Sequence, residues 1–179
     1  MKRKGLNAME KREIEKIVGD LLLRFGYNDG TDTYVDITKL AHLEGFKVGE
    51  TSLLPFKEDG FISISKDKKK LLIGVNNDRA FEEKRFIVAH ELAHYFLHYK
   101  NSNTCDAIMH REHVKGKNEQ ENDADYFAAC ILMPTKSFSK LYHGLRAKEH
   151  PQTEIVDYLQ IVFRTPRESI KRRIEEIAK

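Results

Sequence analysis

Cysteine is scarce in this sequence, which has only Cys105 and Cys130 among its 179 residues. Two thiols cannot form the disulfide framework that holds small secreted domains together, so we expect both to be reduced. The chain also lacks any apolar run near the roughly 20 residues that a membrane-spanning helix needs. Its basic start, MKRKGL, is not followed by a continuous apolar stretch, which argues against a signal peptide. These absences together predict a cytoplasmic protein with no membrane segment.

An excess of charge of one sign is also missing. The 31 Lys and Arg residues are balanced by 28 Asp and Glu residues, which leaves a net charge of +3. This charge is too small to require a nucleic-acid partner. The sequence has no internal repeats and no low-complexity linker, and its length is that of one domain with a buried core. We therefore expect a single domain over 1–179, with parts at 9–75, 76–150 and 151–179.

The first part has the patterns of helices followed by a β-hairpin. The segments with clear patterns are two helices and three short strands, at residues 10–25, 36–44, 46–48, 61–64 and 71–75. Gly26 and Gly45 follow the two helices and are natural helix ends. The lysine-rich run 66–70 separates the last two strands, so we expect a solvated hairpin turn there.

Two longer helices are predicted in the middle of the chain. The first spans 78–99 and begins with an aspartate as its N-cap. The second spans 119–133 and stops at Pro134, which cannot continue a helix. Residues 100–117 between them show no clear period, so we expect a loop with one strand around 107–114.

The C-terminal segment, 153–179, contains two helical patterns with a break near 162–164. The first pattern carries the apolar residues Ile155, Leu159 and Ile161. Thr165-Pro166-Arg167-Glu168 has the form of a capping box, with proline at the first helical position. The second pattern has an apolar face formed by Ile170, Ile174 and Ile177. Its other face carries a basic cluster formed by Lys171, Arg172 and Arg173. A DNA-binding helix-turn-helix would use the basic cluster, whereas a packed helical hairpin would leave it solvated, and the short module and weak charge favour the hairpin.

The sequence HELAH places His90, Glu91 and His94 on the first long helix. Positions four apart lie about 40° apart around a helix and one turn apart along it. Both imidazoles can therefore reach one tetrahedral ion, and Glu91 lies beside that ion, where it can hold a water molecule. The alternative is two histidines on a buried stripe with an incidental glutamate.

His98 continues the four-residue spacing but does not fit as a third ligand. It lies eight residues after His90, which is a rise of about 12 Å along a straight helix. A zinc–nitrogen bond spans only about 2 Å, so these two rings cannot share an ion. We expect His98 to pack against its neighbours or to support a ligand.

The third ligand should come from the second long helix, which begins with an acidic turn. Glu121 and Asp125 lie one turn apart, so Glu121 can bind the metal while Asp125 accepts the N–H of a ligating histidine. Glu119 and Asp123 are competing carboxylates, but Asp123 lies about 200° around the helix from Glu121, so only one of these two can face the metal. An apolar face should pack this helix against the first, through Phe127, Ala128, Ile131 and Leu132.

RFIVAHELAHYFLH, followed by ENDADYFAACILMP, resembles the ImmA/IrrE family of bacterial zinc metallopeptidases. The resemblance extends from the helix at 36–44 to Pro134. It implies zinc on His90, His94 and Glu121, Glu91 as the catalytic base, and Asp125 as the partner of a ligand. The family commonly has glycine where this chain has Ala93, and Glu-Ala where it has Asp123-Ala124, and neither departure removes a proposed ligand.

The resemblance also implies a fold and a mechanism. The fold is an α+β zincin-like domain with a small sheet or hairpin, two long active-site helices and a C-terminal helical hairpin. Zinc would activate a water and polarise the scissile carbonyl, while Glu91 moves the proton to the leaving amine. The tetrahedral oxyanion needs a further donor, for which residues of suitable type are His110, His113, Tyr126 and His143. The sequence does not choose among these four.

The expected partner is a protein substrate. Family members are linked to the control of transcriptional repressors, so the resemblance implies cleavage of one regulator, such as a helix-turn-helix repressor encoded nearby, in a bacterium or mobile element. The alternative is a non-catalytic protein that binds a regulator or DNA on the same scaffold. An intact Glu91 favours the enzyme, because a structural metal site has no use for a base.

Overall fold

The computed structural model describes residues 10–52, 54, 59–65, 70–100 and 119–178. Within this part of the chain it has seven α-helices, one π-helical segment and three strands. Their bounds are α1 Lys11–Arg24, α2 Ile37–Leu43, β1 Phe46–Thr51, β2 Gly60–Ile64, β3 Leu71–Asn76, α3 Phe81–His94, η1 Tyr95–Tyr99, α4 Glu119–Leu132, α5 Thr135–Ala147, α6 Gln152–Phe163 and α7 Arg167–Ile177. The predicted α+β class with a small sheet is confirmed.

The three strands form one mixed sheet in the order β1–β3–β2. β2 and β3 pair antiparallel, with Ile62 opposite Ile73, which confirms the predicted hairpin. β1 runs parallel to β3 on the other side. The sheet packs closely on α3 at Gly60, where any side chain would clash with Ile87 of that helix. A glycine is therefore required for this close approach of β2 to α3.

The first two helices form as their sequence patterns predict. α1 buries four apolar side chains on one face, Ile14, Val18, Leu21 and Leu22. Gly26 follows it with φ +79°, a conformation that side-chain-bearing residues rarely adopt. α2 has Asp36 as its N-cap, and the Asp36 carboxylate accepts a hydrogen bond from the backbone N–H of Lys39 at 3.0 Å. Gly45, with φ +92°, ends α2 and leads into β1.

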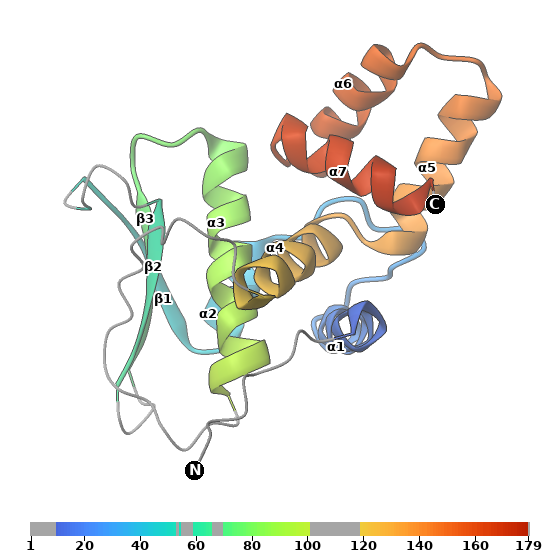
Figure 1. Cartoon of the computed structure of the whole chain (residues 1–179). Coiled ribbons are helices and arrows are strands. Elements are labelled where there is room, and N and C mark those ends of the chain that lie inside the picture. Colours follow the sequence, from blue (N-terminus) through green and yellow to red (C-terminus); the bar gives the residue numbers. More distant parts are fainter. Residues whose placement is uncertain (1–9, 53, 55–58, 66–69, 101–118, 179) are drawn as a thin grey trace.

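α3 is the central helix of the molecule. Figure 1 shows it between the sheet and α4, and α1 packs against α4 on the side away from the sheet. One apolar cluster fills these layers, with buried residues from α1 through α4. All four residues of the predicted apolar face of α4 belong to it, since Phe127, Ala128, Ile131 and Leu132 have 0% exposure. The packing of α3 against α4 brings the predicted site residues together.

The ends of α3 differ from the prediction. Asp78 is not its N-cap, because the helix begins after Ala80. The backbone N–H of Ala80 donates to Glu83 Oε2 at 2.9 Å, so Glu83 satisfies a free N–H of the first turn. After His94 the hydrogen bonding changes, and residues 95–99 continue as a π-helix. Such π-helical segments are rare within helices and are frequent at functional sites.

The C-terminal helices form a second apolar cluster. α5, for which no helix was predicted, packs against α6, and α6 packs against α7, the two helices of the predicted hairpin. Ile170 and Ile174 are buried as expected, and Ile177 packs against the same cluster. Of the apolar residues in the first pattern, Ile155 and Leu159 are buried in this cluster, whereas Ile161 is 68% exposed. In Figure 1 these three helices lie beyond the end of α4, away from the sheet.

Two details of the C-terminal prediction are wrong. The predicted capping box does not form, because α7 begins at Arg167 with Pro166 as its N-cap and no side-chain hydrogen bond closes its first turn. Arg173 is not solvated, since its exposed fraction is 1%. Its guanidinium donates to Thr135 Oγ1 at 2.7 Å, which joins α7 to the start of α5. Lys171 and Arg172 are exposed, so the basic cluster is divided between the interior and the surface.

Other predictions lie partly or wholly outside the described residues. These are the strand around 107–114, the turn at 66–69 and Cys105. Cys130 is described and is a buried free thiol. Among the described helices, none combines the length and the apolar character needed to span a membrane. The single-domain assignment stays a prediction, since the two apolar clusters do not by themselves decide it.

Candidate metal centre

The site lies where α3 packs against α4. His90 and His94 lie one turn apart on α3, and Glu121 comes from the first turn of α4. Small residues of both helices lie in the packed core, since Ala89, Ala93, Ala124 and Ala128 have 0% exposure. Ala93, at the position where the family commonly has glycine, is therefore accommodated in the packed interior.

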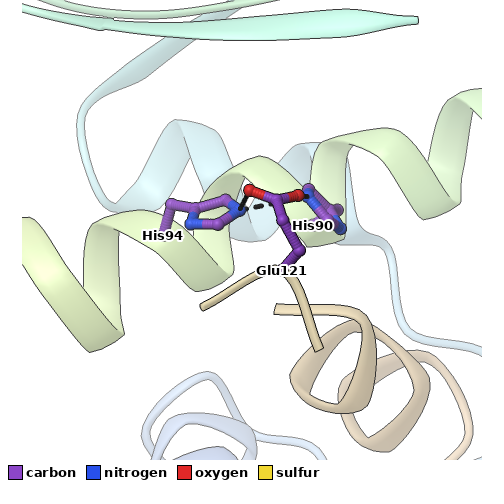
Figure 2. A group of neighbouring side chains, drawn as sticks. All are labelled: His90, His94 and Glu121. Atoms are coloured by element: carbon purple, nitrogen blue, oxygen red, sulfur yellow. Dashed lines mark hydrogen bonds and ion pairs between the residues drawn. The ribbon is translucent and has the colours of Figure 1, made fainter. Parts of the chain in front are cut away.

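The three side chains converge on one point. His90 Nε2 lies 3.0 Å from His94 Nε2 and 3.1 Å from Glu121 Oε2. His94 Nε2 lies 3.7 Å from Glu121 Oε1. One ligand atom from each residue lies within 4.8 Å of the other two. Figure 2 shows the Glu121 carboxylate reaching from α4 to lie between the two imidazole rings.

The other ring nitrogen of His90 contacts Asp125, one turn after Glu121. His90 Nδ1 donates to Asp125 Oδ1 at 3.0 Å, which directs Nε2 toward His94 and Glu121. Burial opposes protonation of His90, but the hydrogen bonds to Asp125 and Glu121 and the charge of Glu91 outweigh it and raise the His90 pKa to about 9. The surroundings of His90 thus favour a positive charge at this point, whether a proton or a metal ion supplies it.

Glu91 is buried beside this group, with 4% exposure. It lines a hollow of about 150 Å³ together with His90, Glu121 and Asp125. Asp59 and Gly60, at the start of β2, form another wall of the same hollow. The arrangement places a carboxylate at the hollow without making it part of the His90–His94–Glu121 group.

The competing candidates lie elsewhere. The His98 ring packs beside the His94 ring, with 5.5 Å between the ring centroids. His98 is not part of the group of possible metal ligands. Asp123 is buried at 8% exposure and Glu119 is exposed, and neither belongs to that group. The geometric argument that only one of Glu121 and Asp123 can face the histidines agrees with this arrangement.

The structure gives little support to the residues suggested as hydrogen-bond donors to the oxyanion. The Tyr126 hydroxyl donates to Glu15 on α1 at 2.7 Å, and Tyr126 does not line the hollow. Burial, with the neighbouring Cys130 and Glu15, raises the pKa of Tyr126 well above its ordinary value. His143 is exposed on α5, while His110 and His113 lie outside the described residues. Neither Tyr126 nor His143 is therefore supported as the donor.

Sequence reasoning missed several residues of the hollow. Phe86 and Ile87 precede the motif on α3, Gly60 is the first residue of β2, and Asp59 directly precedes that strand. No local pattern connects β2 to the metal motif, because their contact depends on how the sheet packs on α3. Arg172 of α7 was also missed as a neighbour of the site, and its Nη1 lies 3.8 Å from Asp125 Oδ2.

The donor set fits a divalent metal. Two imidazole nitrogens and one carboxylate oxygen are the protein ligands typical of a catalytic zinc, which keeps its fourth position for water or substrate. The hydrogen bond from His90 to Asp125 is the carboxylate support that metal-bound histidines usually have. An α+β domain that holds this group of possible metal ligands between two helices has the organisation expected of a metallopeptidase domain.

Comparison with protein families agrees with this class. The family model of the IrrE N-terminal-like domain, a metallopeptidase family, matches residues 43–175, so the chain belongs to the ImmA/IrrE family. The match includes both helices of the metal centre and most of the C-terminal helices. The family resemblance of the two motifs is thereby confirmed.

Individual relatives are more distant. Metallopeptidase ImmA of Bacillus subtilis is 30% identical over 82 residues, which are 46% of this chain and 46% of that protein. The match thus spans less than half of that curated relative. A solved Mycobacterium tuberculosis transcriptional regulator superposes with a TM-score of 0.62 at 16% identity, over 91% of this chain and 46% of the other. At that identity the similarity is one of fold alone.

Proposed function

We propose that this protein is a zinc-dependent endopeptidase that cleaves a specific protein. The observation that carries the proposal is the convergence of His90, His94 and Glu121. Asp125 is hydrogen-bonded to His90, and Glu91 lines the adjoining hollow. Family membership supports the class, since the family is one of metallopeptidases. When bound, zinc supplies Lewis acidity, which lowers the pKa of a coordinated water and polarises a carbonyl oxygen.

The side chains have separate roles in this proposal. His90, His94 and Glu121 hold the ion, and Asp125 keeps the His90 ring in its binding orientation. Glu91 accepts the proton of the attacking water and passes it to the leaving amine. Glu91 is buried, with 4% exposure, at the wall of the hollow beside these ligands. Phe86 and Ile87 give the hollow apolar walls.

The proposed substrate is a transcriptional regulator, such as a helix-turn-helix repressor encoded near this protein's gene. Support comes from membership of the ImmA/IrrE family, whose members are linked to the control of transcriptional repressors. We place the protein in the cytoplasm of a bacterium, where such a regulator acts. A peptidase there must act on few proteins, because broad proteolysis would damage the cell.

The second hypothesis is a non-catalytic protein that binds a regulator or DNA. Nothing in the described residues favours it over the enzyme. For DNA binding, α7 would need its basic cluster at the surface, but Arg173 is buried against Thr135 and Glu176. Lys171 pairs with Glu168 at 2.6 Å, which reduces its charge available to a phosphate.

Co-expression with the neighbouring regulator tests the proposal. We expect wild-type protein to produce a discrete regulator fragment, detected by intact-mass spectrometry, and Glu91→Gln to produce none while it keeps its zinc. The amide of glutamine cannot accept the water's proton, whereas the ligands are unchanged. A regulator cleaved equally by the Glu91→Gln variant would disprove the role of Glu91, and an intact regulator bound by both proteins would favour the non-catalytic alternative.

A further inference from the structure

A second hollow adjoins the metal centre. It has a volume of about 230 Å³ and lies between α1, α4 and α7. Phe86 and Asp125 line both this hollow and the one at the metal centre, so the two are neighbours with common walls. An extended peptide advances only about 3.3 Å per residue, so a chain crossing the metal centre brings nearby side chains to this second hollow.

The walls of the second hollow carry more positive than negative charge. Three cations line it, Lys11, Arg172 and Arg173, against two carboxylates, Asp125 and Glu176. Both carboxylates are already engaged. Asp125 accepts from His90 at 3.0 Å, and Glu176 contacts Arg173 at 3.2 Å and Lys11 at 3.5 Å. One positive charge therefore remains for an anionic occupant.

The cations are held in different ways. Arg173 is buried and held by Thr135 and Glu176, so its charge acts through a poorly solvated interior. The Lys11 side chain is 64% exposed, and its Nζ lies 4.4 Å from the centre of the Tyr126 ring. Arg173 thus supplies a fixed positive charge, whereas Lys11 is held by an exposed ion pair with Glu176 and can turn toward an occupant.

Neutral polar groups complete the hollow. Asn122 and Ser169 line it from α4 and α7, and both side chains can donate hydrogen bonds to a carboxylate. The ring of Tyr126 and the side chains of Phe86 and Ala129 provide apolar walls for a short aliphatic stem. Fixed positive charge, uncharged donors and an apolar wall together match an acidic amino-acid side chain.

We propose that this hollow is a specificity subsite for an aspartate or glutamate side chain of the substrate, and that Lys11 selects its carboxylate. The inference rests on the proposed function, because it concerns a peptide crossing the metal centre. It assigns Lys11 to substrate recognition, although Lys11 lies some 80 positions before the metal motif. An acidic residue close to the scissile bond is then a feature of the regulator that is cleaved.

A binding titration followed by NMR tests this proposal without requiring cleavage. N-acetyl-glutamic acid methylamide is added to the zinc-loaded protein of residues 1–179, and N-acetyl-glutamine methylamide serves as the uncharged control. We expect saturable shifts of the Asn122 and Ser169 amide signals with the glutamate compound only. Lys11→Glu should weaken its binding by about tenfold or more, since a charged hydrogen bond is replaced by repulsion. Lys16→Glu, an exposed change of the same kind on α1, should leave binding as in the wild type.

Several outcomes would overturn the proposal. One is equal binding of the two compounds, and another is binding that survives Lys11→Glu. Shifts confined to the metal centre would mean that the carboxylate binds the zinc instead. Saturation by inorganic phosphate at lower concentration than by the glutamate compound would identify a free-anion site. Because hydrolysis is not measured, a failed titration leaves the peptidase proposal standing, and a missing peptidase activity leaves the titration result valid.

Discussion

At the scale of single residues, the metal motif is the part of the site that could be read from the sequence. The four-residue spacing of His90 and His94 dictates that both rings lie on one side of α3. The angle between Glu121 and Asp123 on α4 dictates that only one of them can face the metal, and the structure places Glu121 against the histidines. Asp59 and Gly60 could not be predicted, because their nearness to Glu91 arises from packing between distant segments.

The contact between Asp125 and His90 gives a prediction for metal affinity. Asp125→Ala should weaken zinc binding by about 10–100-fold, because the His90 ring loses the carboxylate that orients it. Competition with a zinc-binding dye measures this change. Asn122→Ala, an exposed substitution one turn away on the same helix, is the control and should bind zinc as the wild type does. Equal affinities for the wild type and Asp125→Ala would show that the hydrogen bond does not support the ligand.

The buried thiol of Cys130 gives a second residue-scale prediction. Burial raises the Cys130 pKa from its ordinary value of 9.0 to about 11, so at pH 8 almost none of it is the reactive thiolate. In a Cys105→Ser background, we expect Cys130 to react with a disulfide reagent only after denaturant is added. The reaction is followed by absorbance at pH 8. Rapid labelling of the folded protein would contradict the buried position.

At the scale of elements, helices and the hairpin could be predicted more fully than the sheet. Apolar spacing over 10–25 and 119–133 is long enough to define both the helix and its buried face. The parallel pairing of β1 with β3 could not be predicted, because no local sequence pattern specifies which strands are neighbours in the sheet. The burial of Arg173 was predictable in principle, because Arg173 follows Ile170 by three residues and so shares the apolar face of α7.

That burial leads to a stability prediction for α7. Arg173→Ala removes the hydrogen bond to Thr135 Oγ1 and should lower the free energy of unfolding by about 1.5–3 kcal/mol. Lys171→Ala, on the exposed side of the same helix, should change it by less than about 0.5 kcal/mol. Urea unfolding monitored by circular dichroism gives both values. If Arg173→Ala were as stable as Lys171→Ala, Arg173 would have no role in joining α7 to α5.

At the scale of the whole molecule, the metal centre lies near the junction of two apolar clusters. α4 contributes Phe127 and Ile131 to the first cluster, and Met133, directly after its end, belongs to the second. Asp125 on the same helix contacts both His90 of α3 and Arg172 of α7. The C-terminal helices therefore border the site, which explains why a hollow lined by α7 adjoins it.

The central claim is that His90, His94 and Glu121 bind one zinc ion. Zinc per chain, measured by plasma mass spectrometry on purified proteins, tests it most directly. The account predicts close to one zinc in the wild type, in His98→Ala and in Glu119→Ala, and little in His90→Ala, His94→Ala or Glu121→Ala. The two controls remove a neighbouring histidine and a neighbouring carboxylate that lie outside the group. Loss of zinc from His98→Ala together with its retention in Glu121→Ala would contradict the account.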